Sequence, residues 1–278
     1  MTERYESDIA AAFPPGNGSA TVSAAPPPRP TPVPLPASPH GALRPGSRLV
    51  LLHGTATDGR VWTAGPHGAR TATILGELQA HGVDIHTPTR PQSGDLDTEV
   101  AFLTPLCDGA FVVGVSGGAT LGLELAARGV EMAGAVLHEP AAGSLVPGLL
   151  AHVLAGLDAD GLPGFGHALY GPSWQTRMTR ASVATVRAEL EMFSAFEPAP
   201  LTGSIDRVAL TVGGRSPAIR HRSVAALSTF LDLPAGTVPG VGHAAHLEGG
   251  LAHLLGALGR AGHSGRTTDA QVHPPDMS

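Results

Sequence analysis

The chain has 278 residues, 42% of them hydrophobic, and a formal net charge of −6. This is enough for one α/β domain with a sizeable core, and the lack of a basic stripe argues against nucleic acid as a partner. A single cysteine, Cys107, excludes an intramolecular disulfide framework. Because neither a secretory signal nor a run of about 18 apolar residues occurs, we expect a cytoplasmic protein without membrane contact.

The first segment, residues 1–46, is rich in proline, with eleven prolines between Pro14 and Pro45. Proline fixes φ and removes a backbone donor, and this composition cannot bury a core, so we expect a disordered leader. Two interpretations stay open, a leader without a role and a docking segment for a protein partner. Residues 262–278 lack apolar periodicity and are expected to form a flexible tail.

Between these tails, short apolar runs alternate with helical patterns. Arg48–His53 is a continuous apolar run that stops at Gly54, which is typical of a strand buried on both faces. Further strands are expected at residues 83–86, 110–114, 132–138, 208–212 and 237–238, and helices at residues 72–81, 99–106, 120–128, 218–231 and 244–258. The alternation predicts an α/β fold with a mostly parallel central sheet and helices on both faces.

The alternation pauses between residues 142 and 200. This stretch is helical in two or three pieces, including Ser182–Phe196 with apolar residues at helical spacing. An inserted helical block between strands indicates a cap. We therefore expect a core made of residues 47–141 and 201–261, with a helical cap of residues 142–200.

The sequence Gly114-Val115-Ser116-Gly117-Gly118 matches the G-x-S-x-G pattern of a strained strand-to-helix turn that exposes a serine hydroxyl. The pattern is weak in so glycine-rich a chain, but an apolar strand precedes it and a helix follows, as the chemistry requires. The alternative is an ordinary serine in a glycine-rich turn.

Two further turns accompany this one. His53-Gly54-Thr55 follows the first buried strand, and Gly242-His243 stands in a loop before the last expected helix. Together with the Ser116 turn they resemble the α/β-hydrolase superfamily over residues 48–258. The resemblance implies Ser116 as nucleophile, His243 as base, and the backbone N–H groups of Thr55 and Gly117 as oxyanion donors. It implies no metal and no cofactor, and it makes His53 a residue that orients its turn.

The acid of the triad departs from the usual pattern, because Gly213–Pro217, after the 208–212 strand, contains no carboxylate. Glu139 ends the strand that follows the Ser116 helix, a position used by some haloalkane dehalogenases, and could hold the imidazole tautomer. The alternatives are a Glu139 that only binds backbone amides, Asp232 after the following helix as the acid, and a Ser–His dyad. Asp206 precedes its strand and is therefore at the wrong end of it.

The side chains that would contact the substrate are less well defined. His53, Trp62, Trp174 and Met192 are candidates, with core or cap packing as the alternative. Other apolar cap residues suited to a hydrophobic ligand are Phe165, Tyr170, Met178 and Phe193. The cap arginines Arg177, Arg180 and Arg187 would attract an anionic substrate, unless they simply form a solvated helix face.

These features favour a serine hydrolase that cleaves an ester, thioester or related bond of a small apolar metabolite through an acyl-enzyme. Two alternatives remain. One is a cofactor-free enzyme of specialised metabolism that uses the same site for cyclisation, elimination or carbon–carbon cleavage. The other is a ligand-binding protein with a degenerate site. A serine at position 116 disfavours an aspartate-type epoxide hydrolase or dehalogenase.

Overall fold

The computed structural model describes residues 31–32, 42–202 and 207–261. The predictions for most of the leader, for the tail 262–278 and for Asp206 lie outside the described residues. A parallel sheet forms the centre, in the order β1-β7-β6-β5-β4-β2-β3. Its strands are β1 (Thr31–Pro32), β2 (Arg48–Leu52), β3 (Asp84–His86), β4 (Phe111–Val115), β5 (Gly134–His138), β6 (Val208–Gly213) and β7 (Ala235–Val238).

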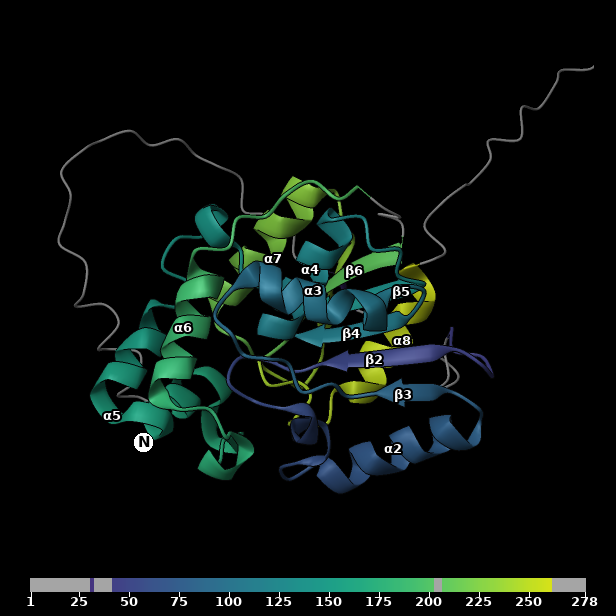
Figure 1. Cartoon of the computed structure of the whole chain (residues 1–278), viewed down its shortest axis with the longest axis horizontal. Coiled ribbons are helices and arrows are strands. Elements are labelled where there is room, and N and C mark those ends of the chain that lie inside the picture. Colours follow the sequence, from purple (N-terminus) through teal and green to yellow (C-terminus); the bar gives the residue numbers. More distant parts are fainter. Residues whose placement is uncertain (1–30, 33–41, 203–206, 262–278) are drawn as a thin grey trace, which may run out of the picture.

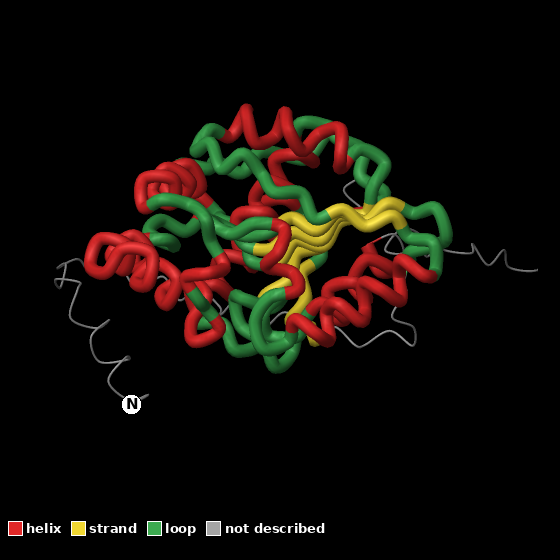
Figure 2. Tube along the Cα trace, turned by 60° about the horizontal axis from the view of Figure 1, so that its bottom comes forward, coloured by secondary structure: helices red, strands yellow, loops and turns green. Residues whose placement is uncertain are grey.

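Helices cover both faces of this sheet (Figure 2). They are α2 (Gly68–Ala80), α3 (Leu96–Cys107), α4 (Gly117–Ala127), α5 (Ala151–Tyr170), α6 (Val183–Ser194), α7 (Ala218–Leu231) and α8 (Leu251–Ala261). The short 3-10 turns are η2 (Gly59–Thr63), η3 (Gly143–Leu145), η4 (Gly171–Ser173) and η5 (Thr176–Met178). The predicted fold class is confirmed. None of the described helices has the length and apolar character needed to cross a membrane.

The core lies where the central strands meet the helices packed on them. β4 and β5 are buried almost throughout because α4 packs on both strands and α8 packs chiefly on β5. The sequence encodes this burial as continuous β-branched and aliphatic runs, such as Phe111–Val115, in place of alternating polar and apolar residues.

The predicted helical insertion is present between β5 and β6 and contains α5 and α6. We call residues 142–200 the cap. In Figure 1 the arrowheads of β2, β3 and β4 point toward α5 and α6, so the cap lies at the carboxyl edge of the sheet. α5 is broken at Asp160 and Gly161, where the backbone leaves helical geometry. From β2 the chain first adds β3 on one side of the sheet and then β4 and the later strands on the other side. Ligands of open α/β sheets bind at such a switch point, here between β2 and β4.

The last predicted helix, residues 244–258, is wrong in its first half. α8 begins only at Leu251, and residues 243–249 form turns. One helical turn does form, with Glu248 N donating to Ala244 O at 3.1 Å. It ends at Gly249, whose φ of +81° is left-handed, and Gly250 N bonds back to Ala245 O. This pattern closes a helix C-terminus, which the apolar periodicity did not reveal.

Candidate active site

Ser116 sits in the turn between β4 and α4 with φ 53° and ψ −121°, a conformation costly for a residue other than glycine. The neighbouring glycines make this turn feasible. A Cβ on Gly118 would lie 2.4 Å from Leu52 O, and one on Gly114 would lie 2.7 Å from Gly118 O. The strained turn is anchored by Ser116 N, which donates to His138 O at 2.8 Å.

His243 joins Ser116 to Glu139 in an unbroken chain of hydrogen bonds. The Ser116 hydroxyl lies 2.9 Å from His243 Nε2, and His243 Nδ1 lies 2.7 Å from Glu139 Oε2. Because a carboxylate only accepts, Nδ1 carries the proton and Nε2 is free to accept from the serine. The fold brings together three side chains that stand far apart in the sequence, at the ends of adjacent strands and in the loop before α8.

The loop after β6 lacks the expected carboxylate. Instead, the last residue of β6 and a serine of this loop donate hydrogen bonds to Glu139. Gly213 N donates to Glu139 Oε1 at 2.8 Å, and the Ser216 hydroxyl donates to the same oxygen. The other oxygen, Oε2, therefore faces His243. Sequence reasoning missed Ser216, and its only signal was a polar residue at the strand end where an acid was expected.

Two further residues, both missed from the sequence, hold the loop that carries His243. Glu248 accepts from Gly242 N at 2.8 Å, and His138 Nε2 lies 3.2 Å from Gly242 O. Since that carbonyl only accepts, His138 is a donor at Nε2, and its Nδ1 accepts from the Thr211 hydroxyl at 3.0 Å. Gly242 is thus fixed at both its N–H and its C=O.

Burial and charge set the protonation of His243 and Glu139. Burial, reinforced by the Arg220 guanidinium, lowers the pKa of His243 to about 4 despite the opposing effect of Glu139. Burial also works against ionised Glu139, but its hydrogen bond to His243 and that ring's charge, with further help from His138 and Arg220, hold its pKa well below the usual range. At neutral pH His243 is therefore uncharged and Glu139 is ionised, which is the protonation that a base and an orienting acid require.

The turn that follows β2, residues 53–57, which we call the β2 turn, lies against Ser116. A Cβ on Gly54 would come within 3.3 Å of Ser116 Cβ, and one on Gly117 within 3.0 Å of the Thr55 hydroxyl. Gly117 is the first residue of α4, so its N–H has no partner within the helix. The predicted oxyanion residues, Thr55 and Gly117, are thus placed side by side next to the serine.

Residues 49–252 match the model of the Alpha/beta hydrolase family. The chain belongs to the alpha/beta hydrolase family. It is therefore an enzyme of the hydrolase type, and the resemblance stated from its three turns is confirmed. No curated protein matches the chain in sequence.

Solved structures similar to this hydrolase show the fold alone, because their sequence identities are low. MenH from S. aureus is 14% identical with a TM-score of 0.54, covering 79% of this chain and 95% of its own. An esterase, RhEst1 from Rhodococcus sp. ECU1013, is 17% identical with a TM-score of 0.53, covering 79% and 91%. A deformylase from Pseudomonas putida S16 is 16% identical with a TM-score of 0.52, covering 77% and 92%.

His53 is fully buried in this hydrolase and bonds chiefly to backbone, with the Thr57 hydroxyl 3.4 Å from its Nδ1. Its Nδ1 lies 3.0 Å from Gly54 O, and its Nε2 accepts from Arg90 N at 3.3 Å. Burial, with the Arg90 charge, lowers the pKa of His53 to about 3, so the ring is neutral. The structure places His53 in support of the β2 turn.

An aromatic cluster lies beside His243. Tyr170 stacks on Trp174 with 5.2 Å between ring centroids, and His246 lies 5.4 Å from Trp62 and 6.1 Å from Tyr170. His246 was expected on a helix, but the break at Gly249 places it in a buried turn. The ring nitrogens of Trp62, Trp174 and His246 have no hydrogen-bond partner among the described residues. Trp62 and Trp174 are buried packing residues at this position.

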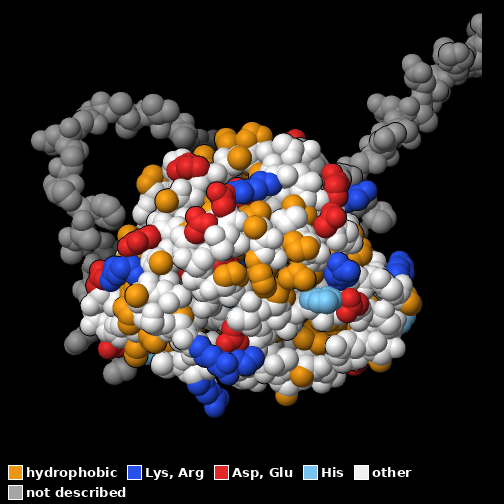
Figure 3. Space-filling model, viewed as in Figure 1, with side chains coloured by type: hydrophobic (Ala, Val, Ile, Leu, Met, Phe, Trp, Pro, Cys, Tyr) orange, Lys and Arg blue, Asp and Glu red, His pale blue; other side chains and the backbone are white. Residues whose placement is uncertain are grey.

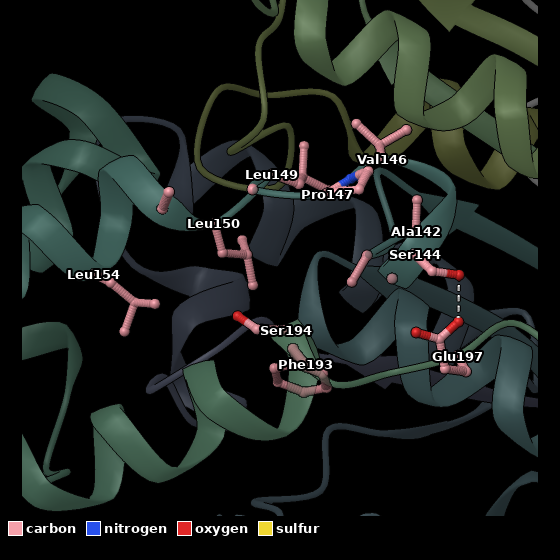
Figure 4. A pocket seen from close by; sticks show the side chains of 14 residues that line it. Ala142, Ser144, Val146, Pro147, Leu149, Leu150, Leu154, Phe193, Ser194 and Glu197 are labelled. Carbon is pink, nitrogen blue, oxygen red and sulfur yellow. Dashed lines mark hydrogen bonds between the residues drawn. The ribbon is translucent and has the colours of Figure 1, made fainter. Parts of the chain in front are cut away.

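A pocket of about 460 Å³ opens between the segment after β5 and the cap helices (Figure 4). Leu150, Leu154 and Ala142 supply apolar walls, and Ser144 bonds Glu197 at 2.6 Å on one side. Phe193 lines the same pocket, and its ring lies 2.6 Å from the position of a Cβ on Gly117. The Phe193 ring therefore stands between this pocket and the serine turn. Met192, its neighbour on α6, is half-buried against the core and does not line the pocket.

The cap cations lie apart from this pocket. Arg187 pairs with Asp158 on the surface, and Arg177 and Arg180 are exposed. Arg177 lines a second pocket of about 350 Å³ together with Arg60. On the face of the molecule that Figure 3 shows, basic side chains gather at the lower edge. Among the described residues, no group of three or more His, Cys, Asp and Glu side chains is placed to hold a metal ion.

Proposed function

We propose that this protein is a serine hydrolase that cleaves an ester, thioester or related bond of a small apolar molecule through an acyl-enzyme. The observation that carries the proposal is the unbroken hydrogen-bonded chain from the Ser116 hydroxyl through His243 to Glu139. A serine hydroxyl is a poor nucleophile at neutral pH, and an adjacent neutral imidazole oriented by a carboxylate is the arrangement that activates it.

In this mechanism His243 takes the Ser116 proton as the hydroxyl oxygen attacks the substrate carbonyl carbon. The imidazolium that forms is stabilised by Glu139, and the negative carbonyl oxygen by the N–H groups of Thr55 and Gly117. The intermediate collapses to an acyl-serine, and the leaving alcohol or thiol receives the proton from His243. A water molecule, deprotonated by the same imidazole, then attacks the acyl-serine, and collapse of the second intermediate returns the proton to Ser116.

The burial of the site favours a small substrate. Ser116 is only 7% exposed and His243 only 9%, because the cap covers the carboxyl edge of the sheet. A polymer cannot reach a serine in such a position, whereas a small acyl compound fits the pocket that the Phe193 ring separates from the serine turn. The walls of Leu150, Leu154 and Phe193 suit an apolar acyl group in that pocket.

The first test is intact mass measurement after incubation with a small fluorophosphonate. We expect one adduct on the native protein, none on Ser116→Ala, and slower labelling of Glu139→Gln. An activated p-nitrophenyl ester should be hydrolysed by the native protein and not by Ser116→Ala. If a control hydrolase is labelled and this protein is not, the acyl-enzyme proposal fails, and chemistry driven by His243 without a nucleophilic serine becomes the better hypothesis.

A further inference from the structure

A cluster of buried charges lies between the cap and the β2 turn. Arg90 Nη1 is 2.9 Å from Glu99 Oε2, and Arg90 Nη2 is 2.8 Å from Glu189 Oε1. All three side chains are fully buried. Two carboxylates surround one guanidinium, so the second carboxylate needs further donors to be stable away from water.

Glu189 finds its further donor in the β2 turn. Its second oxygen, Oε2, accepts from Ala56 N at 2.7 Å. Tyr170, the last residue of α5, donates from its hydroxyl to Thr55 O at 2.6 Å. The C=O of Thr55 and the N–H of Ala56 belong to one peptide group, so two cap residues hydrogen-bond that group at both ends. Ala56 has a left-handed φ of 59°, which such contacts must maintain.

The preceding peptide group is held from the other side of the same cluster. Gly54 O accepts from Arg90 Nη2 at 3.3 Å and from the Thr57 hydroxyl at 3.0 Å. In a planar trans peptide the C=O and N–H point in opposite directions. Holding the Gly54 carbonyl therefore fixes the direction in which the Thr55 N–H points.

We propose that Glu189 is a positioning residue through which the cap sets the oxyanion site. With Arg90 and Tyr170 it fixes the two peptide groups on either side of Thr55, so the Thr55 N–H is correctly directed only while α6 is seated on the β2 turn. The catalytic part of this inference rests on the proposed function, and the structural part does not. The cap thus contributes to catalysis as well as covering the site.

The test compares Glu189→Gln with the matched variant Glu99→Gln. Each removes one negative charge beside Arg90 and leaves it paired with one remaining carboxylate, so the buried cluster becomes neutral in both variants. Only Glu189 reaches the β2 turn, because the other oxygen of Glu99 accepts from the N–H and the hydroxyl of Ser93. A glutamine at position 189 has one acceptor oxygen, so it cannot serve both Ala56 N and Arg90.

The first measurement is amide hydrogen exchange of the β2 turn, which requires no substrate. We expect the Ala56 amide to exchange about 10-fold faster or more in Glu189→Gln and less than about 3-fold faster in Glu99→Gln. The second is turnover of an activated ester, where Glu189→Gln should lower kcat by about 10- to 100-fold with little change in KM, because the oxyanion donor acts in the transition state. Tyr170→Phe, which removes the hydrogen bond to Thr55 O, should give a smaller loss of kcat with little change in KM.

Two results would overturn the inference. One is unchanged exchange at Ala56 in Glu189→Gln. The other is an equal effect of Glu189→Gln and Glu99→Gln on exchange and on kcat, which is the behaviour of an ion pair that only stabilises the fold. If the native protein neither reacts with the fluorophosphonate nor hydrolyses esters, the proposed function fails, and the exchange comparison still decides whether Glu189 positions the turn.

Discussion

Replacing Glu139 with glutamine tests whether this carboxylate selects the working tautomer of His243. In the native site Oε1 accepts from Gly213 N and the Ser216 hydroxyl, and Oε2 accepts from His243 Nδ1. A glutamine keeps its single oxygen toward the two donors, because turning it around would set its NH₂ against the Gly213 N–H. The NH₂ then faces His243 and requires Nδ1 to accept, so the proton moves to Nε2, where it blocks transfer from Ser116.

The expected loss follows from that tautomer. An equivalent change in a serine triad of intact geometry lowers kcat by about 10⁴-fold, so we expect a loss of about 10³- to 10⁴-fold, or about 4–5.5 kcal/mol of transition-state stabilisation. KM should stay within a few-fold, because the ground-state substrate does not contact Glu139. The buried Arg220, whose Nε lies 3.9 Å from Glu139 Oε2, loses its nearby charge, which should lower the free energy of unfolding by roughly 1–3 kcal/mol.

The assay is steady-state hydrolysis of an activated ester, with the melting temperature measured on the same samples to separate lost activity from lost fold. Glu139→Asp serves as the control, because it keeps the charge and moves it by one methylene, and it should retain more activity than Glu139→Gln. A Glu139→Gln protein that folds and keeps more than about a tenth of native kcat would refute the orienting role. The active unit would then be a Ser–His dyad.

Three further predictions concern pH, chain length and packing. Because His243 must be neutral to act as base and its pKa is lowered to about 4, kcat/KM should fall only as the pH drops through about 4, and a limb near 6.5 in a pH–rate profile would contradict this. Phe193→Ala should open the path from the pocket to Gly117 and raise kcat/KM for longer acyl chains relative to acetate, so an unchanged chain-length profile would count against that path. Gly118→Ala should abolish folding or fluorophosphonate labelling, because its Cβ would meet backbone oxygen. Gly76→Ala on α2, whose Cβ would meet open space, should instead raise the free energy of unfolding by about 0.5–1 kcal/mol in a denaturant titration.

Local pattern was enough to predict the fold and to single out the residues of the Ser116 turn. A buried parallel strand must be apolar throughout, and a tight strand-to-helix turn needs small residues, so both leave a mark within a few positions of the sequence. Chain order then pointed to the loop of His243, and Glu139 was selected because the usual acid position is empty. These predictions depend on neighbours along the chain or on the order of the strands.

Contacts between distant segments left no such mark. The Ser216 hydroxyl at Glu139, the Arg220 charge near it and the bond of Glu189 to Ala56 each join residues that lie far apart in the sequence. From the sequence alone Glu189 is one polar position of a helix, and nothing in its surroundings distinguishes it from a solvent-facing glutamate. The wrong start of the last helix has a related origin, because the left-handed φ at Gly249 is a choice among conformations that glycine allows in many turns.

The sequence by itself thus determined strands β2 to β7, most of the helices and which short turns gather at the carboxyl edge of the sheet, because these follow from backbone propensity and apolar periodicity. It did not reveal β1, which lies in the segment expected to be disordered. Only the tertiary structure decided which oxygen of Glu139 faces His243, which way the peptide groups around Thr55 point, and that the cap holds them. Hydrogen-bond direction depends on partners brought within about 3 Å by folding, and no pattern of neighbouring residues encodes it.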